Sequence, residues 1–222
     1  ADIVNNIKQL TYEAIIRVNN FKTDEFPKKE IATIMGIEQY CLFRIGDAGF
    51  PLQQLQFSSP GENKFPNADT GKLLQPSEWY HVAVVYDTEK KTAVIYVDGR
   101  EQSRIEDYGN GEPVNLGKQT RGKDFMFKIG HSYGDPDYME RQLDGEICEV
   151  RVWNVARSQQ EIFDNMYNIE DPANTPGLQA YWKFNEGEGD IAKDYTGHGN
   201  DAKAYVKATW PAGIEVTQKN KE

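Results

Sequence analysis

The chain has 222 residues, and its 25 basic and 35 acidic side chains give a formal net charge of −10 at pH 7. This length suits one large all-β domain with a sizeable core, and the negative charge argues against nucleic acid as a partner because it repels phosphate backbones. No apolar run in the sequence approaches the roughly 20 residues of a membrane-spanning helix, so we expect no membrane insertion of this segment.

Short alternations of apolar and polar residues recur along the chain, separated by clusters of Gly, Pro, Asn and Asp. Such patterns are typical of half-buried antiparallel strands. In the segment 10–18, Tyr12, Ala14 and Ile16 fall on one face, while the opposite face is more polar. The predicted strands are 10–18, 31–37, 41–45, 52–57, 79–86, 92–97, 125–129, 146–153 and 178–184.

One segment departs from this pattern and predicts a short helix. The residues SQQE at 158–161 form a capping box, in which the Ser158 hydroxyl and the Glu161 carboxylate each satisfy a backbone N–H at a helix start. Ile162, Phe163 and Met166 follow with helical spacing and give the helix one apolar stripe. No internal repeat is visible, so we expect a single domain over 1–222 with a frayed tail at 218–222.

The two cysteines, Cys41 and Cys148, are too few for a disulfide framework and fit no metal or redox spacing. Both fall inside predicted strands, where a free cysteine behaves as a small buried apolar residue. Cysteine usage therefore does not fix the cellular compartment.

Three blocks of sequence, in a fixed order, carry a family likeness. They are WYHVA at 79–83 with IYVDG at 95–99, then LDGEICEVRVWN at 143–154, and then GLQAYWKFNEG at 177–187 with DYTGHGN at 194–200. The first block resembles a conserved hairpin, the second a central strand and the third the C-terminal ending of laminin-G-like domains. Over most of its length the chain thus resembles the concanavalin A-like lectin/glucanase superfamily, of the type found in bacterial surface proteins.

This resemblance implies an all-β fold, namely a two-sheet antiparallel jelly-roll β-sandwich, with the predicted short helix added to it. It also implies a secreted or surface-anchored protein, so we expect an extracellular or cell-surface location. The family's leading strand is short before Leu10, which suggests a piece of a longer protein. The fold hosts several functions, so function has to be argued from the site.

A glycoside hydrolase is one alternative, with Asp144, Glu146 and Glu149 as its carboxylates. Glycosidases need paired carboxylates, and residues two apart on a strand share a face. Retaining glucanases of the resembled superfamily carry Glu-x-Asp-x-x-Glu on one strand, but here the acidic types at the first two positions are exchanged. Without a β-bulge, Glu149 should also face away from Glu146. The pattern therefore favours a protein that is not an enzyme.

The segment DYTGHGND at 194–201 is a candidate calcium site. Calcium prefers several oxygen ligands, and Asp194 and Asn200 supply side-chain oxygens beside glycines. The alternative is a turn in which Asp and Asn cap the backbone without metal, because these residues favour turns unaided.

Two loops offer the mixture that sugar binding needs, which is aromatic faces beside polar side chains. The first loop spans 107–110 and the second spans 131–141. Loops on a rigid sandwich commonly carry recognition. The candidate ligand-binding residues are Asp107, Tyr108, Asn110, Tyr133, Asp135, Asp137, Tyr138 and Arg141.

The sequence as a whole favours a non-catalytic extracellular carbohydrate-binding accessory module whose partner is a polysaccharide or oligosaccharide. A structural or protein-binding module of a surface protein is the first alternative, and the glycoside hydrolase is the second. Convergence of aromatic and polar loop residues on one concave site would favour the carbohydrate-binding module. A broad exposed apolar patch would favour protein binding.

Overall fold

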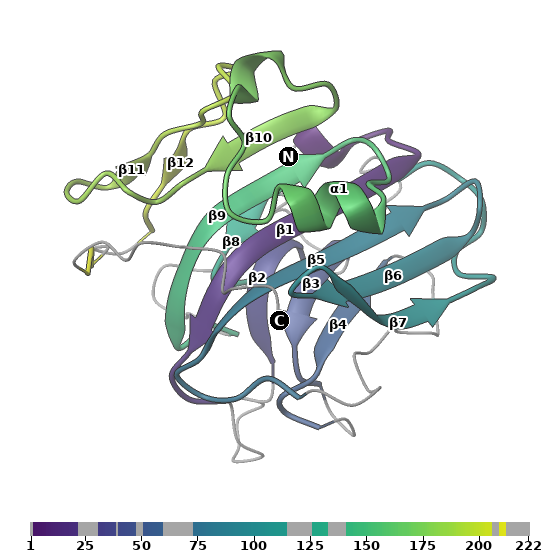
Figure 1. The fold of residues 1–222 in the computed structure, drawn as a ribbon, viewed down its shortest axis with the longest axis horizontal. Helices are drawn as coiled ribbons and strands as arrows, with labels where there is room; N and C mark the ends of the chain where they lie inside the picture. The colour runs from purple at the N-terminus through teal and green to yellow at the C-terminus, as the bar shows by residue number, and fades with distance from the viewer. Residues whose placement is uncertain are drawn as a thin grey trace.

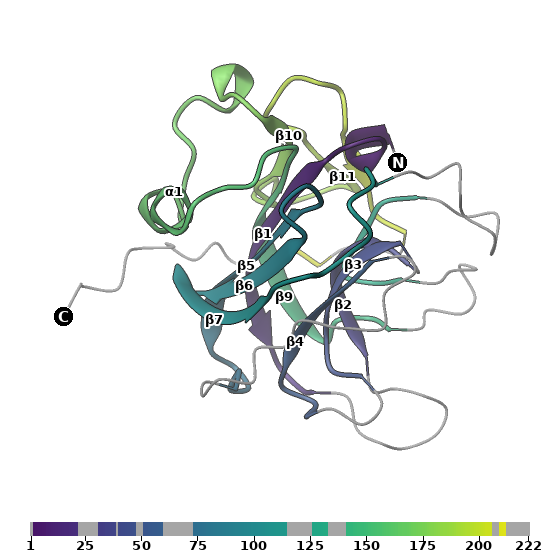
Figure 2. The ribbon, with the colours of Figure 1, turned by 90° about the vertical axis from the view of Figure 1, so that its right-hand side faces the viewer.

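The computed structural model describes residues 2–21, 31–38, 40–47, 51–59, 73–114, 126–132, 141–205 and 209–211. Within these ranges two antiparallel sheets pack face to face, and a short helix lies against the outer face of the larger sheet (Figures 1 and 2). The predicted all-β sandwich with one short α-helix is confirmed for this part of the chain. No helix in it is long and apolar enough to cross a membrane.

The larger sheet has the order β10-β9-β1-β5-β6-β7. Its central strand β1 pairs antiparallel with both β5 and β9, so the N-terminal strand is inserted between segments far along the chain. The bounds are β1 Gln9–Val18, β5 Trp79–Asp87, β6 Thr92–Val97, β7 Arg100–Ile105, β9 Gly145–Trp153 and β10 Leu178–Trp182.

The smaller sheet has the order β4-β3-β2-β8, and a separate two-stranded sheet joins β11 to β12. The 3-10 helices η1 and η3 and the helix α1 complete the described elements. The bounds are η1 Asp2–Val4, β2 Ala32–Ile37, β3 Cys41–Ile45, β4 Leu55–Ser58, β8 Lys128–Ile129, α1 Gln159–Asp164, η3 Pro172–Asn174, β11 Ile191–Ala192 and β12 Ala202–Lys203.

The main core lies between the two sheets, as the alternation in β1 predicts. Tyr12, Ala14 and Ile16 are fully buried there. The rings of Tyr12 and Phe57 meet edge to face with centroids 6.4 Å apart, which is a favourable geometry for aromatic pairs. Trp182 is also buried and stacks on Phe127 at 5.9 Å. The aromatic residues of both sheets therefore fill the interior.

A bulge in β10 changes which residues share a face. The pairing with β9 shifts between Leu178 and Ala180. Ala180 therefore joins the main core, while Leu178 packs with Trp153 and Tyr181 on the outer face. Perfect alternation from Leu178 onwards would have put Leu178 in the same core as Ala180, and the extra residue of the bulge is the reason it does not.

The helix α1 begins as its capping box predicts. The Ser158 hydroxyl accepts a hydrogen bond from the Glu161 backbone N–H, and the Glu161 carboxylate accepts one from the Ser158 backbone N–H at 2.7 Å. Ile162 is fully buried and packs on the outer face of β5 and β6. Gly99 allows this approach, because a Cβ there would lie 2.7 Å from the Phe163 ring. Helix and sheet therefore form a second, smaller apolar contact.

Candidate functional site

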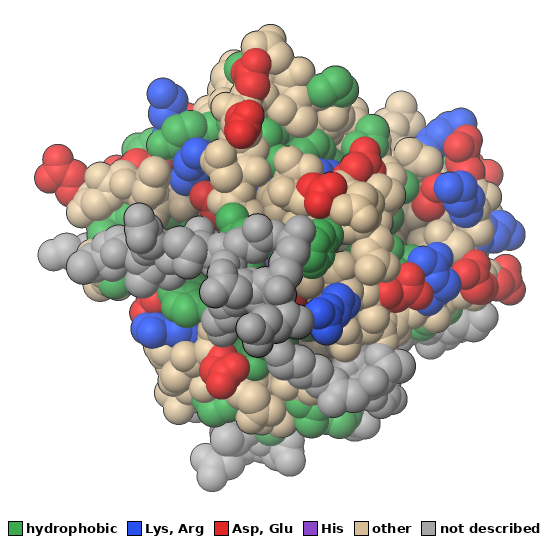
Figure 3. Space-filling view, in the orientation of Figure 1, with side chains coloured by type: hydrophobic (Ala, Val, Ile, Leu, Met, Phe, Trp, Pro, Cys, Tyr) green, Lys and Arg blue, Asp and Glu red, His purple; other side chains and the backbone are tan. Residues whose placement is uncertain are grey.

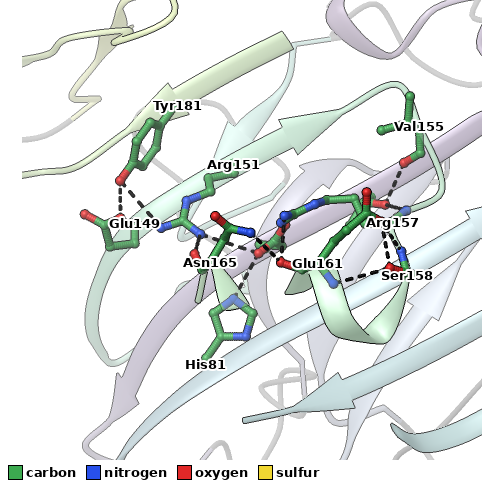
Figure 4. A network of polar contacts seen from close by, with 11 residues as sticks. His81, Glu149, Arg151, Val155, Arg157, Ser158, Glu161, Asn165 and Tyr181 are labelled. Carbon is green, nitrogen blue, oxygen red and sulfur yellow. Dashed lines mark hydrogen bonds and ion pairs between the residues drawn. The ribbon is translucent and has the colours of Figure 1, made fainter. Parts of the chain in front are cut away.

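A buried network of charged residues lies on the outer face of the larger sheet, beneath α1 (Figure 4). Glu13 of β1 is its centre and is fully buried. The Glu13 carboxylate lies 3.1 Å from His81 Nε2 of β5 and 3.5 Å from Arg151 Nη1 of β9, and it accepts a hydrogen bond from Arg157. Three strands and the segment before α1 thus converge on one carboxylate.

The two arginines also tie the helix to the sheet. Arg157 Nη2 donates to the Glu161 carbonyl at 2.8 Å, and Arg151 Nη1 donates to the Asn165 carbonyl at 2.7 Å. These carbonyls lie within and just after α1, where helix carbonyls lack partners of their own. The network therefore fixes the position of α1 and the chain that follows it.

A β-bulge in β9 adds Glu149 to this network. The pairing with β1 jumps from Glu13 opposite Arg151 to Ile15 opposite Cys148, and Glu149 has a φ of 53°. Its carboxylate lies 2.5 Å from Arg151 Nη2 and accepts a hydrogen bond from the Tyr181 hydroxyl. Glu149 therefore lies on the outer face with Arg151. The expectation that it faces away from Glu146 applied to a strand without a bulge, and this strand has one.

The charges of the network are balanced within it. Burial opposes ionisation of Glu13, but the hydrogen bond with His81 and the positive charges of Arg157 and Arg151 outweigh it and lower the pKa of Glu13 to about 2. Two carboxylates thus face two guanidinium groups, because Glu149 pairs with Arg151. Buried charges of this kind are tolerated because they are paired. We therefore interpret the network as structural, since it holds α1 on the sheet.

The carboxylates that sequence suggested for catalysis are each engaged by a different group. Asp144 accepts a hydrogen bond from Asn20 Nδ2 at 2.9 Å. Glu146 pairs with Arg17, whose guanidinium lies 5.5 Å from the centroid of the Trp79 ring. Glu149 is held inside the network as described above. Within the described ranges no group of three His, Cys, Asp or Glu residues is arranged to hold a metal ion.

An open cleft of about 740 Å³ lies beside the network, between α1 and the segment around η3. Trp153 is buried and is covered by the Arg157 guanidinium, which lies 4.1 Å from its ring centroid. Tyr167 is partly exposed. The lining residues are Trp153, Val155, Arg157, Glu161, Asp164, Asn165, Tyr167, Asn168, Ile169, Glu170, Asp171, Thr175 and Pro176. Aromatic, amide and carboxylate side chains therefore share one concave surface.

The first predicted binding loop does not present its aromatic ring. Tyr108 is fully buried, and its hydroxyl donates to the Phe57 carbonyl at 3.4 Å. Its ring meets Tyr86 edge to face at 5.4 Å. The prediction that Tyr108 is an exposed stacking face is wrong, because a tight turn directs it into the sandwich. Asp107 and Asn110 beside it are exposed.

The second predicted loop is described at its two ends. Arg141 pairs with Glu38, with 2.6 Å between Nη1 and Oε1. The other oxygen of Glu38 accepts a hydrogen bond from the Ser132 hydroxyl at 2.6 Å. Glu38 thus holds both ends of the segment, and Arg141 has a structural partner. Four predicted contacts, Tyr133, Asp135, Asp137 and Tyr138, lie outside the described residues.

The candidate calcium residues lie together in one turn. Asp194 accepts hydrogen bonds from the backbone N–H groups of Tyr181, Thr196 and Asn200 at 3.2, 3.0 and 3.1 Å. Burial raises the pKa of Asp194, but these bonds and that from the Thr196 hydroxyl outweigh it, so its pKa is lowered. Asn200 Nδ2 donates to the Gln179 carbonyl at 3.1 Å. This geometry fits the turn interpretation, and calcium binding stays a prediction.

The cleft is a feature that sequence reasoning did not identify. Its lining combines the end of β9, α1 and a Pro-containing segment that the sequence presents as a chain break. The available signal was the set of Asn and acidic residues within 164–171, which begins in the last part of the predicted helix and continues beyond it. Whether these residues line a cleft depends on how α1 packs on the sheet, which the sequence does not show.

Comparisons with known proteins place the chain in a family. Residues 3–163 match the model of the concanavalin A-like lectin/glucanase superfamily. The structure of a proposed carbohydrate-binding protein from Bacteroides ovatus ATCC 8483 is 32% identical, with a TM-score of 0.71. The match covers 95% of this chain and 56% of that one, so this chain spans little more than half of the length of its relative. The comparison with curated proteins gave no match.

Two more distant structures share the sandwich. One is the CBM40 module of the Ruminococcus gnavus IT-sialidase bound to α2,3-sialyllactose, with 14% identity, a TM-score of 0.52 and coverage of 74% of this chain and 85% of that one. The other is domain 4 of an extracellular GH43 arabinanase from Geobacillus stearothermophilus in complex with arabinotriose, with 16% identity, a TM-score of 0.50 and coverage of 73% and 68%. These likenesses show the fold. The family model that matches residues 3–163 shows that the chain belongs to the concanavalin A-like lectin/glucanase superfamily.

Proposed function

We propose that this chain is a non-catalytic carbohydrate-binding module that works outside the cell or at its surface. The observation that carries the proposal is the 32% identity over 95% of the chain to a protein that is itself proposed to bind carbohydrate. The sandwich is also the fold on which the sialidase and arabinanase modules hold their oligosaccharides. The partner that this supports is a polysaccharide or oligosaccharide.

The pairing of the carboxylates supports binding without cleavage. A glycosidase needs one carboxyl group to donate a proton and a second to act as base or nucleophile. Glu146 pairs with Arg17, and Glu149 pairs with Arg151 beneath the helix. Each carboxylate is thus engaged by a structural partner, and Glu149 is also buried. The glycoside hydrolase therefore remains the less supported alternative.

The direct test is a glycan array screened with the purified chain, followed by assays of reducing-end release on every glycan that binds. We expect weak binding and no release, both in the native chain and in Glu146→Gln. Release that disappears in Glu146→Gln would overturn the proposal in favour of a hydrolase. A blank array would favour a structural or protein-binding module instead.

The loop residues that sequence singled out supply a second test within this proposal. If Tyr133 or Tyr138 stacks on a sugar, its replacement by Ala should weaken binding by about 1–3 kcal/mol, as expected for truncation of an anchoring aromatic residue. Ile191→Ala is the control, since Ile191 is an exposed apolar residue, 43% exposed, that belongs to neither predicted loop. If all three variants bind the glycan with the same affinity as the native chain, Tyr133 and Tyr138 do not contact the sugar. Labelling of the protein on intact cells of its source would test the proposed location.

A further inference from the structure

We infer that the cleft beside α1 is the carbohydrate-binding site and that it takes an uncharged oligosaccharide. This inference rests on the proposed function and adds to it the place of binding and the class of sugar. The site is built from the end of β9, α1 and the segment up to Pro176, and none of its lining residues belongs to the described parts of the two loops considered above.

The size and lining of the cleft suit a short oligosaccharide. Its volume of about 740 Å³ falls within the usual range for small-ligand sites, which is roughly 300–1,000 Å³. Tyr167 offers a partly exposed ring for the apolar face of a sugar. Trp153 lines the same cleft, and its buried indole N–H has no hydrogen-bond partner among the described residues. Because this N–H is buried and the Arg157 guanidinium covers the ring, Trp153 forms part of the cleft wall, and Tyr167 is the aromatic residue that a sugar would contact.

The amide side chains of the cleft keep unused hydrogen-bonding capacity. Asn168 is exposed, and its Oδ1 accepts a hydrogen bond from Lys183 at 3.2 Å. Its NH₂ group has no partner among the described residues and could donate to a ligand. Asn165 Nδ2 donates to the Glu161 carbonyl at 2.9 Å, which leaves its Oδ1 as an acceptor. A donor and an acceptor near an aromatic ring are the groups that recognise a sugar hydroxyl pair.

The charge of the cleft argues for an uncharged sugar. Its lining includes four exposed carboxylates, Glu161, Asp164, Glu170 and Asp171. Figure 3 shows acidic side chains on this face, over α1 and over the segment of η3. Among the described lining residues Arg157 is the cation, and it is buried and paired with Glu13. Carboxylates accept hydrogen bonds from sugar hydroxyls, but they repel the carboxylate or sulfate of an acidic glycan.

One cation at the rim does not reverse this balance. Lys183 reaches Asn168, but its ammonium group also lies over the Tyr181 and Tyr195 rings, 5.4 and 5.2 Å from their centroids. It does not line the cleft itself. Among the described residues the four lining carboxylates therefore outnumber the cations near the cleft, and charges closer than a Debye length of about 8 Å are incompletely screened.

The test uses a glycan array that contains neutral members such as lactose and arabinotriose and acidic members such as α2,3-sialyllactose. We expect neutral members to bind, and Tyr167→Ala to weaken them by roughly tenfold or more. Asn168→Ala should weaken them severalfold. Tyr205→Ala is the matched control, because its exposed ring lies outside the cleft. Melting curves verify folding, and Asn168 supplies the test if Tyr167→Ala unfolds.

A charge reversal tests the class of sugar. Glu170→Lys should raise the ratio of acidic to neutral binding severalfold, whereas Glu188→Lys should leave this ratio unchanged. Both glutamates are exposed, and Glu188 does not line the cleft. A blank array defeats the proposed function itself. Neutral binding that survives in both Tyr167→Ala and Asn168→Ala, or hits confined to acidic glycans in the native chain, would overturn this inference while the proposed function stands.

Discussion

Two adjoining regions on the outer face of the larger sheet differ in the environment of their charged side chains. Beneath α1, Glu13, Arg151 and Arg157 are buried and bonded to one another. Beside α1, Asp164 and Glu170 are exposed at the edge of an open cleft. The first arrangement holds a helix in place, and the second leaves polar groups for a ligand. Burial and ion pairing therefore distinguish the structural charges from the candidate binding groups, since Asp164 and Glu170 form no ion pair with the described residues.

The largest expected effect comes from breaking the buried region. Glu13→Gln should destabilise the fold by about 3–5 kcal/mol, because it leaves Arg151 and Arg157 buried with less compensating charge. Chemical denaturation measures this shift. Glu188→Gln, at an exposed position, should change stability by less than about 0.5 kcal/mol. A similarly small effect of Glu13→Gln would show that the network does not hold the helix.

The pH dependence of stability gives a second test of the buried network. The pKa of Glu13 is lowered from 4.5 to about 2 in the folded chain, so its contribution is complete well above pH 4.5 and is lost as pH falls toward 2. Between pH 6 and pH 3 the native chain should lose on the order of 2 kcal/mol more stability than Glu13→Gln. Denaturation of both chains at each pH measures the difference. Parallel curves would contradict the assigned role of Glu13.

The fold was largely predictable because its signals are local. Alternation identified β1, and the capping box located the start of α1. Strand β7 was missed, since its residues REQSRI form an exposed edge with little apolar pattern. Tyr108 was misplaced because burial of a loop residue depends on the turn that directs it.

The cleft was beyond sequence reasoning for a related reason. Its lining comes from one strand, one helix and one connecting segment, and their relative positions depend on the buried network. The bulge at Glu149 likewise follows from pairing with β1, more than 130 residues away in the chain. Long-range pairing of this kind leaves no periodic signal in a single sequence.

The smallest expected effect concerns the turn at Asp194. If Asp194 and Asn200 bind calcium, the ion should raise the melting temperature, by an amount equivalent to about 1.4 kcal/mol at ten times the dissociation constant. The test compares melts in calcium and in chelator, with Asp201→Asn as a neighbouring variant. Identical melts of the native chain would leave the turn interpretation, in which backbone N–H groups occupy the Asp194 carboxylate.

The most direct test of the account is a nuclear magnetic resonance titration of the isotope-labelled chain with the neutral glycan that binds best on the array. The account predicts shifts of the Trp153 indole and the Asn168 side-chain amide, which line the cleft. The Trp182 indole, which donates to the Asn200 carbonyl at 2.7 Å, should stay unchanged. The glycan signals should show no new reducing ends over time. Growth of such ends, or shifts that spare Trp153 and Asn168, would contradict it.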